Sequence, residues 1–186
     1  NFDEIEKKDI HEGDKVEIQR AGDVIPQVLK VVKKEKNRKK IIKPPLYCPV
    51  CRSKTIKEKD EAIIRCTNTV NCDAQNLGAL IHFVSKKSLN IEGLGEKQIN
   101  QFYKLDFIKN FEDIFYINRY KNIILDLEGW GELSFQNLIK SIEKSKSIAL
   151  DKFIFSLGIR YLGETLSSLI AKEFLTIDSF INSSMD

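Results

Sequence analysis

The sequence predicts a multidomain chain of three unlike parts: a small β segment, a segment that contains four cysteines, and an all-α segment with internal repeats. Apolar residues that alternate with polar ones indicate the β segment, over residues 1–43. Every cysteine lies between Cys48 and Cys72, which places the second part at residues 44–76. A glycine-containing pattern that recurs three times between apolar helical stretches indicates the third part, over residues 77–186.

The composition excludes few function classes. At 42% hydrophobic and 31% charged residues, the 186-residue chain resembles an ordinary globular protein. No stretch approaches the roughly 20 apolar residues of a membrane span, and residues 1–4 lack a signal-peptide pattern. We therefore expect a cytoplasmic protein with no membrane partner. The missing initiator methionine and the incomplete features described below lead us to expect that both ends are cut.

The β segment reads as a hairpin. Lys15–Arg20 alternates in polarity, and Val24–Val32 follows the turn signal Ala21-Gly22-Asp23. Pro26 lacks an N–H, so we expect an edge strand or a bulge there. Two or three strands cannot bury a core, so this segment is expected to be the end of a larger β domain.

A basic run closes the β segment. It contains a single acid, Glu35, and eight basic residues: Lys30, Lys33, Lys34, Lys36, Arg38, Lys39, Lys40 and Lys43. Such a run is typical of a solvated linker or of a surface that binds phosphates, and both interpretations stay open. Pro44 and Pro45 then predict a stiff joint to the second part.

The cysteines have the spacing of a metal site. Cys48 and Cys51 form a C-x2-C turn, and Cys66 and Cys72 follow. A tetrahedral zinc ion takes four thiolates at about 2.3 Å, and such a turn supplies two of them. Two disulfides or free buried thiols are the alternatives, although disulfides are rare in cytoplasmic proteins. We predict structural zinc, because four thiolates leave no coordination position open for catalysis.

A small β-ribbon is expected between the cysteine pairs. Thr55–Glu58 and Ala62–Arg65 flank the polar turn Lys59-Asp60-Glu61. The two histidines, His11 and His82, are not needed as ligands. His82 lies in the helical run Ala79–Lys86 and is expected to be a helix-face residue.

The repeated pattern predicts helix, tight turn, helix. It occurs at Ile91–Glu96, Leu127–Glu132 and Ile159–Glu164, each time before an amphipathic helix. Glycine allows a positive φ and a close approach of the backbone to a phosphate. The following helix points its unpaired N–H groups and the positive end of its dipole at that phosphate. The candidate contacts are Gly93, Gly95, Lys97, Gly129, Gly131, Arg160 and Gly163, with Arg20 and the basic run as secondary candidates.

An alternative is that these glycines only turn the chain between packed helices. Tyr161 replaces the first glycine of the third pattern, so that turn could be structural, with Arg160 reaching a phosphate instead. The glutamates that follow the last glycines could also compete with a phosphate; they are Glu96, Glu132 and Glu164.

Together these residues resemble the bacterial NAD-dependent DNA ligases. Asn1–Ile5, Gly13-Asp14 and Arg20–Pro26 resemble the end of that family's OB-fold domain. The cysteine spacing, including the five residues between Cys66 and Cys72, is similar to its four-cysteine zinc finger. Ile91–Gly95, Leu127–Gly131 and Gly158–Gly163 look like its first three helix-hairpin-helix motifs.

The resemblance implies an enzyme that seals nicks in duplex DNA during replication and repair, using NAD and Mg²⁺. The family's nucleotidyltransferase domain, with its Lys-x-Asp-Gly motif, would precede Asn1, and a fourth hairpin and a BRCT domain would follow Asp186. No residue of this chain is then catalytic. The chain alone is expected to be an inactive monomer that binds nicked duplex DNA without reading sequence, its zinc finger bracing the OB-fold part against the hairpins.

Two further functions stay open. A free-standing DNA-binding adaptor would use the same hairpins without a catalytic domain, but it should not begin partway through a β domain. A zinc-braced scaffold for protein partners would show no salt-dependent affinity for DNA.

Overall fold

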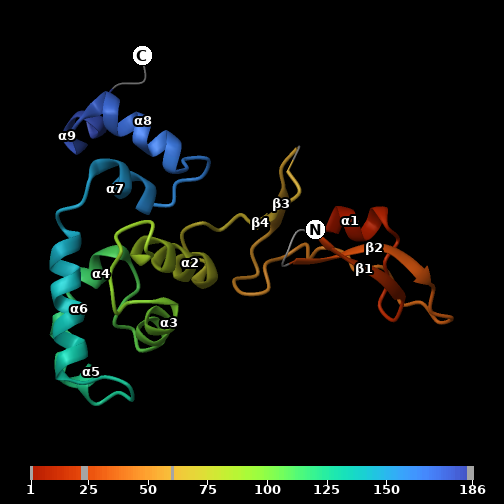
Figure 1. The fold of residues 1–186 in the computed structure, drawn as a ribbon, viewed down its shortest axis with the longest axis horizontal. Coiled ribbons are helices and arrows are strands. Elements are labelled where there is room, and N and C mark those ends of the chain that lie inside the picture. The colour runs from red at the N-terminus through yellow and green to blue at the C-terminus, as the bar shows by residue number, and fades with distance from the viewer. Residues whose placement is uncertain (1, 22–24, 60, 184–186) are drawn as a thin grey trace. The chain divides into compact units, whose positions relative to one another are not determined.

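The computed structural model describes residues 2–21, 25–59 and 61–183 (Figure 1). The chain divides into two compact units, Asn1–Thr69 and Val70–Asp186. Gly22, Asp23 and Val24 of the expected hairpin, and Asp60 of the expected ribbon turn, lie outside the described residues. No described helix is long and apolar enough to cross a membrane.

The first unit contains the predicted hairpin. β1 (Lys15–Ala21) pairs antiparallel with β2 (Ile25–Lys33) (Figure 1). Pro26 lies opposite Arg20, and the register shifts fall at the other end of β1, beside Val16 and Ile18, rather than at the proline. The segment was predicted as β throughout, yet α1 (Phe2–Lys7) is helical. This helix has acids in its first turn and a lysine in its last turn, and these charges interact favourably with the helix dipole. This signal was overlooked because the whole segment was interpreted from its strand pattern.

An arginine fixes the basic run to the loop before β1. Arg38 donates from Nη1 to Asp9 Oδ2 at 2.8 Å and from Nη2 to Asp14 Oδ2 at 2.7 Å. The Asp14 side chain is fully buried, and it also accepts the Glu35 N–H at 2.9 Å. The hydrogen bonds from Arg38 hold the pKa of both carboxyl groups well below their usual range. A charged Arg38 therefore stabilises the fold of this segment.

We expect the stability difference between this protein and its Arg38→Gln variant to shrink as the pH falls. Both aspartates have a depressed folded pKa. Their stabilisation is therefore complete above the unfolded pKa of about 3.9 and is lost as the pH falls toward the folded pKa. Thermal unfolding midpoints of both proteins, compared between about pH 7 and pH 3, test this. Acid effects on the cysteines are common to both proteins and cancel. If the difference between the two unfolding midpoints stayed constant as the pH falls, this expectation would be contradicted.

The cysteine segment is built on the predicted ribbon. β3 (Thr55–Lys57) pairs antiparallel with β4 (Ile64–Cys66), with Ile56 opposite Arg65. An isolated bridge between Tyr47 and Lys54 extends this pairing toward the first cysteine turn. So small a ribbon has almost no core of its own, which is why a bound metal was expected to hold it.

The second unit is helical (Figure 1). Its elements are α2 (Asp73–Val84), α3 (Glu96–Lys104), α4 (Phe111–Phe115), η1 (Ile117–Tyr120), α5 (Lys121–Leu125), α6 (Glu132–Ser145), α7 (Leu150–Ser156), α8 (Glu164–Phe174) and α9 (Ile177–Ile181). The predicted helices after Gly95, Gly131 and Gly163 are α3, α6 and α8.

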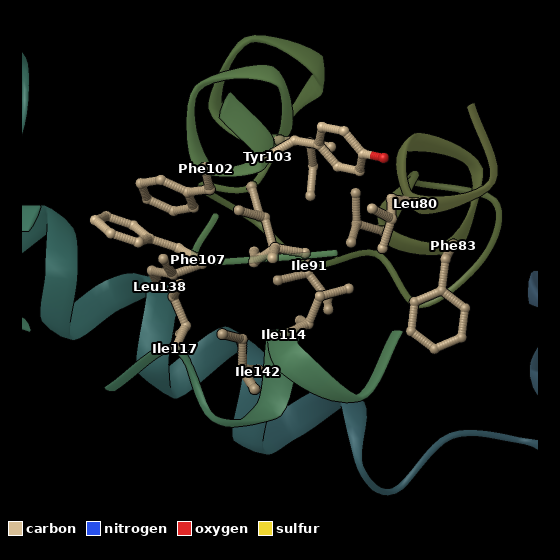
Figure 2. Close-up of a cluster of buried hydrophobic side chains, with 14 of the residues drawn as sticks. Leu80, Phe83, Ile91, Phe102, Tyr103, Phe107, Ile114, Ile117, Leu138 and Ile142 are labelled. Carbon is tan, nitrogen blue, oxygen red and sulfur yellow. The ribbon is translucent and has the colours of Figure 1, made fainter. Parts of the chain in front are cut away.

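One apolar core joins α2, α3, α4 and α6 (Figure 2). Leu80 of α2, Phe102 of α3, Ile114 of α4 and Leu138 of α6 are almost completely buried in it. Trp130, from the second repeated turn, stacks on Phe102 with ring centroids 5.3 Å apart. The core therefore fixes the second turn against α3.

Candidate zinc centre and phosphate-binding turns

The four cysteines form one cluster. The Sγ atoms of Cys48, Cys51, Cys66 and Cys72 all lie within 4.8 Å of one another. Cys51 and Cys66 are 3.4 Å apart, far beyond a disulfide bond of about 2.05 Å, and none of the four forms a disulfide. A tetrahedron of thiolates at about 2.3 Å from zinc has edges of roughly 3.8 Å. The cluster therefore has the ligand type, number and spacing of a structural zinc site.

Local backbone hydrogen bonds shape the cluster. In the C-x2-C turn, the N–H groups of Cys51 and Val50 donate to the Cys48 sulfur, which lowers the pKa of that thiol. Burial raises the pKa of Cys66 to about 11, so without a metal Cys66 stays protonated at neutral pH and needs a cation to become a thiolate. Cys72 is the N-cap of α2.

The three repeated turns share one backbone geometry. A backbone hydrogen bond closes each: Leu94 to Ile91 at 3.3 Å, Trp130 to Leu127 at 3.1 Å, and Leu162 to Ile159 at 3.0 Å. The third residue of each has a positive φ: 85° at Gly93, 84° at Gly129 and 66° at Tyr161. A positive φ at this position is typical of a type II turn. The repeat seen in the sequence is therefore a repeat of conformation.

Each turn leads into a helix through an exposed glycine. Gly95, Gly131 and Gly163 are the N-caps of α3, α6 and α8. Each accepts an N–H from four residues on, at 2.9 to 3.0 Å, while the first-turn N–H groups have no partner within the helix. A side chain at Gly131 or Gly163 would meet no atom within 4 Å. The first-turn amides of these helices are therefore open to a ligand.

Two family models match parts of the chain. Residues 1–40 match the NAD-dependent DNA ligase OB-fold domain, and residues 47–74 match the NAD-dependent DNA ligase C4 zinc finger domain. The DNA ligase of Rickettsia bellii (strain OSU 85-389) is 44% identical over 186 residues, covering 97% of this chain and 27% of the relative. That of Gluconobacter oxydans (strain 621H) is 42% identical over 180 residues, covering 97% and 26%.

The chain belongs to the NAD-dependent DNA ligase family. It spans about a quarter of the length of these curated relatives. The OB-fold and zinc-finger parts of the predicted fold class are confirmed, and all four cysteines lie inside the matched zinc-finger residues. The matched domains end at residue 74, so the helix-hairpin-helix assignment of the three turns stays a prediction.

The third turn keeps its shape without the glycine. Tyr161 takes the left-handed conformation that Gly93 and Gly129 take, although a tyrosine adopts it at a cost. The guanidinium of Arg160 lies 4.6 Å from the centre of the Tyr161 ring. Tyr161 therefore does not remove the turn, but it strains the turn.

We expect Tyr161→Gly to raise the free energy of unfolding of the chain by about 1 kcal/mol, because glycine adopts a positive φ freely. Tyr161 as a whole residue is 68% exposed, so little buried surface is lost. Thermal unfolding of Tyr161→Gly and of the control Tyr161→Ala measures this. Alanine also removes the ring but keeps the strained Cβ, so an alanine variant as stable as the glycine variant would contradict the expectation.

Two of the three glutamates that follow the N-cap glycines form ion pairs with lysines. Glu132 pairs with Lys121 at 2.7 Å, which lowers the pKa of the glutamate, and Glu164 pairs with Lys87 at 2.8 Å. Glu96 has no ion pair among the described residues. The expected competition between these carboxylates and a phosphate is thus reduced at α6 and α8, because each carboxylate has a nearby cation.

The other candidates are exposed side chains. Lys97 is the second residue of α3, and Arg20 lies near the end of β1. Of the basic run, Arg38 binds Asp9 and Asp14, as described above. Three lysines also pair with acids of their own unit: Lys30 with Glu17, Lys34 with Asp9 and Lys39 with Glu12. Half of the run is therefore partly neutralised.

Sequence reasoning missed one contact beside the cluster. Tyr103 donates from its hydroxyl to Asp73 Oδ1 at 2.7 Å, and Asp73 directly follows Cys72. Burial and this carboxylate raise the pKa of Tyr103 to about 12, so the tyrosine stays a donor at physiological pH. His82 lies in α2, and its Nε2 contacts the Phe155 carbonyl at 2.9 Å, which joins α2 to α7. Both pairs are distant in sequence, so no local pattern reveals them.

Proposed function

We propose that this chain binds duplex DNA through its phosphates and is the DNA-binding part of an enzyme that seals nicks. The observation that carries the proposal is the shared geometry of the three turns. Each ends in an exposed glycine in front of open first-turn amides. Three such ends in one chain whose relatives are named DNA ligases favour phosphates over packing alone.

The contacts follow from helix chemistry. Phosphate oxygens accept hydrogen bonds from the first-turn N–H groups of α3, α6 and α8, which the helix dipole strengthens. Lys97 and Arg160 add charged contacts beside the first and third turns. None of these groups reads a base edge, so binding tolerates any sequence and weakens with salt.

The glycines at the N-caps support this interpretation. Gly95, Gly131 and Gly163 have φ values of −82°, −152° and −82°, which other residues also adopt. At Gly131 and Gly163 no packed atom excludes a side chain. Since neither conformation nor packing requires glycine there, close approach of a ligand to the backbone is one physical reason for it.

The zinc ion would hold the finger together through Cys48, Cys51, Cys66 and Cys72. Its role is structural, because four thiolates fill the coordination sphere. In the reaction we propose, a 3′-hydroxyl is joined to a 5′-phosphate with NAD and Mg²⁺, in DNA replication and repair. This chain holds the duplex as a cytoplasmic monomer, and NAD and Mg²⁺ bind outside it, since its sequence contains no Lys-x-Asp-Gly motif.

A binding titration tests the proposal. Nicked and intact duplexes of unrelated sequence are titrated with the zinc-loaded chain between roughly 50 and 200 mM salt. We expect similar affinity for every sequence and a log–log salt slope of about −3 or steeper, at about −0.9 per phosphate. An affinity that does not change with the salt concentration, or no binding to either duplex, would contradict the proposal. Either result would favour a scaffold for protein partners. A Lys-x-Asp-Gly motif upstream in the gene distinguishes a ligase from a free-standing adaptor.

A further inference from the structure

A polar groove runs along α6 in the helical unit. Its volume is about 630 Å³, and Gly93 of the first repeated turn lies on one side of it. Ser134, Asn137, Lys140 and Lys144 line the other side, all on α6. They recur every three or four residues, so they share one face of the helix. The groove therefore begins at the first turn of α6, just after Gly131, and also borders the first repeated turn.

The first repeated turn is fixed against α6. The Glu92 N–H donates to Ser141 Oγ at 2.7 Å, and Gly93 packs against Leu138, whose Cβ would lie 3.7 Å from a side chain built there. Leu138 is completely buried. Because both sides of the groove belong to one packed unit, the groove is present before any ligand binds.

The groove carries cationic charge that is not neutralised. Lys140 and Lys144 lie one helical turn apart, where two like charges repel each other. Among the residues the structure describes, no carboxylate lies within 4.0 Å of either ammonium group, whereas Lys146 pairs with Glu143 at 2.6 Å. Glu92 is the single acid of the lining. An anionic ligand would relieve the repulsion between the two lysines.

The lining and the length of the groove favour a polymeric anion. Small-molecule pockets are mostly apolar, and this lining consists of polar and charged residues and a glycine. From Ser134 to Lys144 the helix rises roughly 15 Å, at about 1.5 Å per residue. Successive phosphates of one strand of duplex DNA are about 3.4 Å apart along the duplex axis and farther apart along the strand itself, so the groove is long enough for more than one phosphate.

We propose that this groove takes one strand of the sugar–phosphate backbone, with Lys140 and Lys144 each contacting a phosphate. This inference rests on the proposed function and deepens it. The strand would pass from the amides of the first repeated turn along α6, so that two turns and the groove between them form one continuous surface. Asn137 donates a hydrogen bond to the same strand, and Glu92 opposes it.

The test compares salt-dependent DNA binding of full-chain variants, with helical content checked by circular dichroism. Lys140→Gln/Lys144→Gln should make the log–log slope shallower by about 2, at about 0.9 per lost phosphate, and weaken binding at least tenfold at low salt. The matched control is Lys152→Gln/Lys172→Gln, which removes two exposed lysines of α7 and α8 and should leave the slope near that of the unchanged chain. Glu92→Gln should strengthen binding.

Each outcome decides between the two proposals. If the unchanged chain binds in a salt-dependent way but the groove variant behaves like its control, the groove proposal is wrong and the proposed function stands. If Glu92→Gln weakens binding, the groove proposal is also overturned. If the unchanged chain binds no duplex, the proposed function fails, and the groove proposal fails with it.

Discussion

Replacing Cys48 with serine is expected to abolish stoichiometric zinc binding and to unfold residues 47–74. The four sulfur atoms lie within 4.8 Å of one another, so one lost thiolate leaves an incomplete tetrahedron. Zinc contributes about 10 kcal/mol or more to the folding of comparable fingers, and the two three-residue strands here cannot replace it. Metal analysis of the purified protein and amide hydrogen exchange over these residues measure the loss. Cys66→Ser should behave in the same way.

The matched control for this substitution is Val50→Ser. Val50 lies in the same C-x2-C turn and is 53% exposed, so the change adds the same hydroxyl but keeps every thiolate. We expect it to keep one zinc per chain and normal protection, and a chelator added to the unchanged protein should reproduce the cysteine variants. Unchanged metal content and thermal stability in Cys48→Ser would falsify the structural zinc site.

The elements that could be predicted from the sequence are those set by local patterns. Alternation in Lys15–Arg20 predicted β1, and the helices α3, α6 and α8 begin directly after the predicted glycines. The same local signals explain the three turns, because a positive φ at Gly93 and Gly129 is a property of the residue itself. A repeated pattern whose glycines favour one turn type restricts the backbone to few conformations.

The elements that were missed depend on contacts between distant residues. Three short helices, α4, η1 and α5, lie between the first and second turns. Each contains one buried isoleucine: Ile114, Ile117 and Ile124, respectively. Tertiary packing rather than periodicity therefore fixes these helices. The pairing of the basic run with acids many residues away belongs to the same class. Its positive charge was visible in the sequence, and its partial neutralisation was not.

The cysteine site has one feature that could be predicted from the sequence and one that could not. The C-x2-C turn is a local signal and indicated two candidate ligands directly. The wider gap between Cys66 and Cys72 is explained by the structure: Cys66 ends β4, whereas Cys72 is the N-cap of α2, and the intervening residues connect a strand to a helix. The clustering of the four cysteines could therefore be predicted from the residue type, whereas the reason for the spacing between Cys66 and Cys72 could not.

Gly131→Asp is expected to weaken DNA binding about tenfold or more while leaving the fold intact. The φ of −152° and the empty space around Gly131 admit a side chain, and aspartate caps a helix at least as well as glycine. Its carboxylate would occupy the first-turn amides of α6 and repel a phosphate, at a loss of about 1.5–3 kcal/mol for a charge-assisted hydrogen bond. Combined with Gly95→Asp and Gly163→Asp, the loss should reach about a thousandfold if the three sites act independently.

Gly131→Asn separates charge from occupancy, because asparagine has the same size and also caps the helix but carries no charge. Duplex titrations at several salt concentrations should place it between the unchanged chain and Gly131→Asp, and thermal unfolding should show all three equally stable or better. If glycine served only to turn the chain, Gly131→Asp would bind DNA as tightly as the unchanged chain, since this substitution alters neither the turn nor the packing. A loss of affinity without a loss of stability is therefore the result that distinguishes a phosphate site from a structural turn.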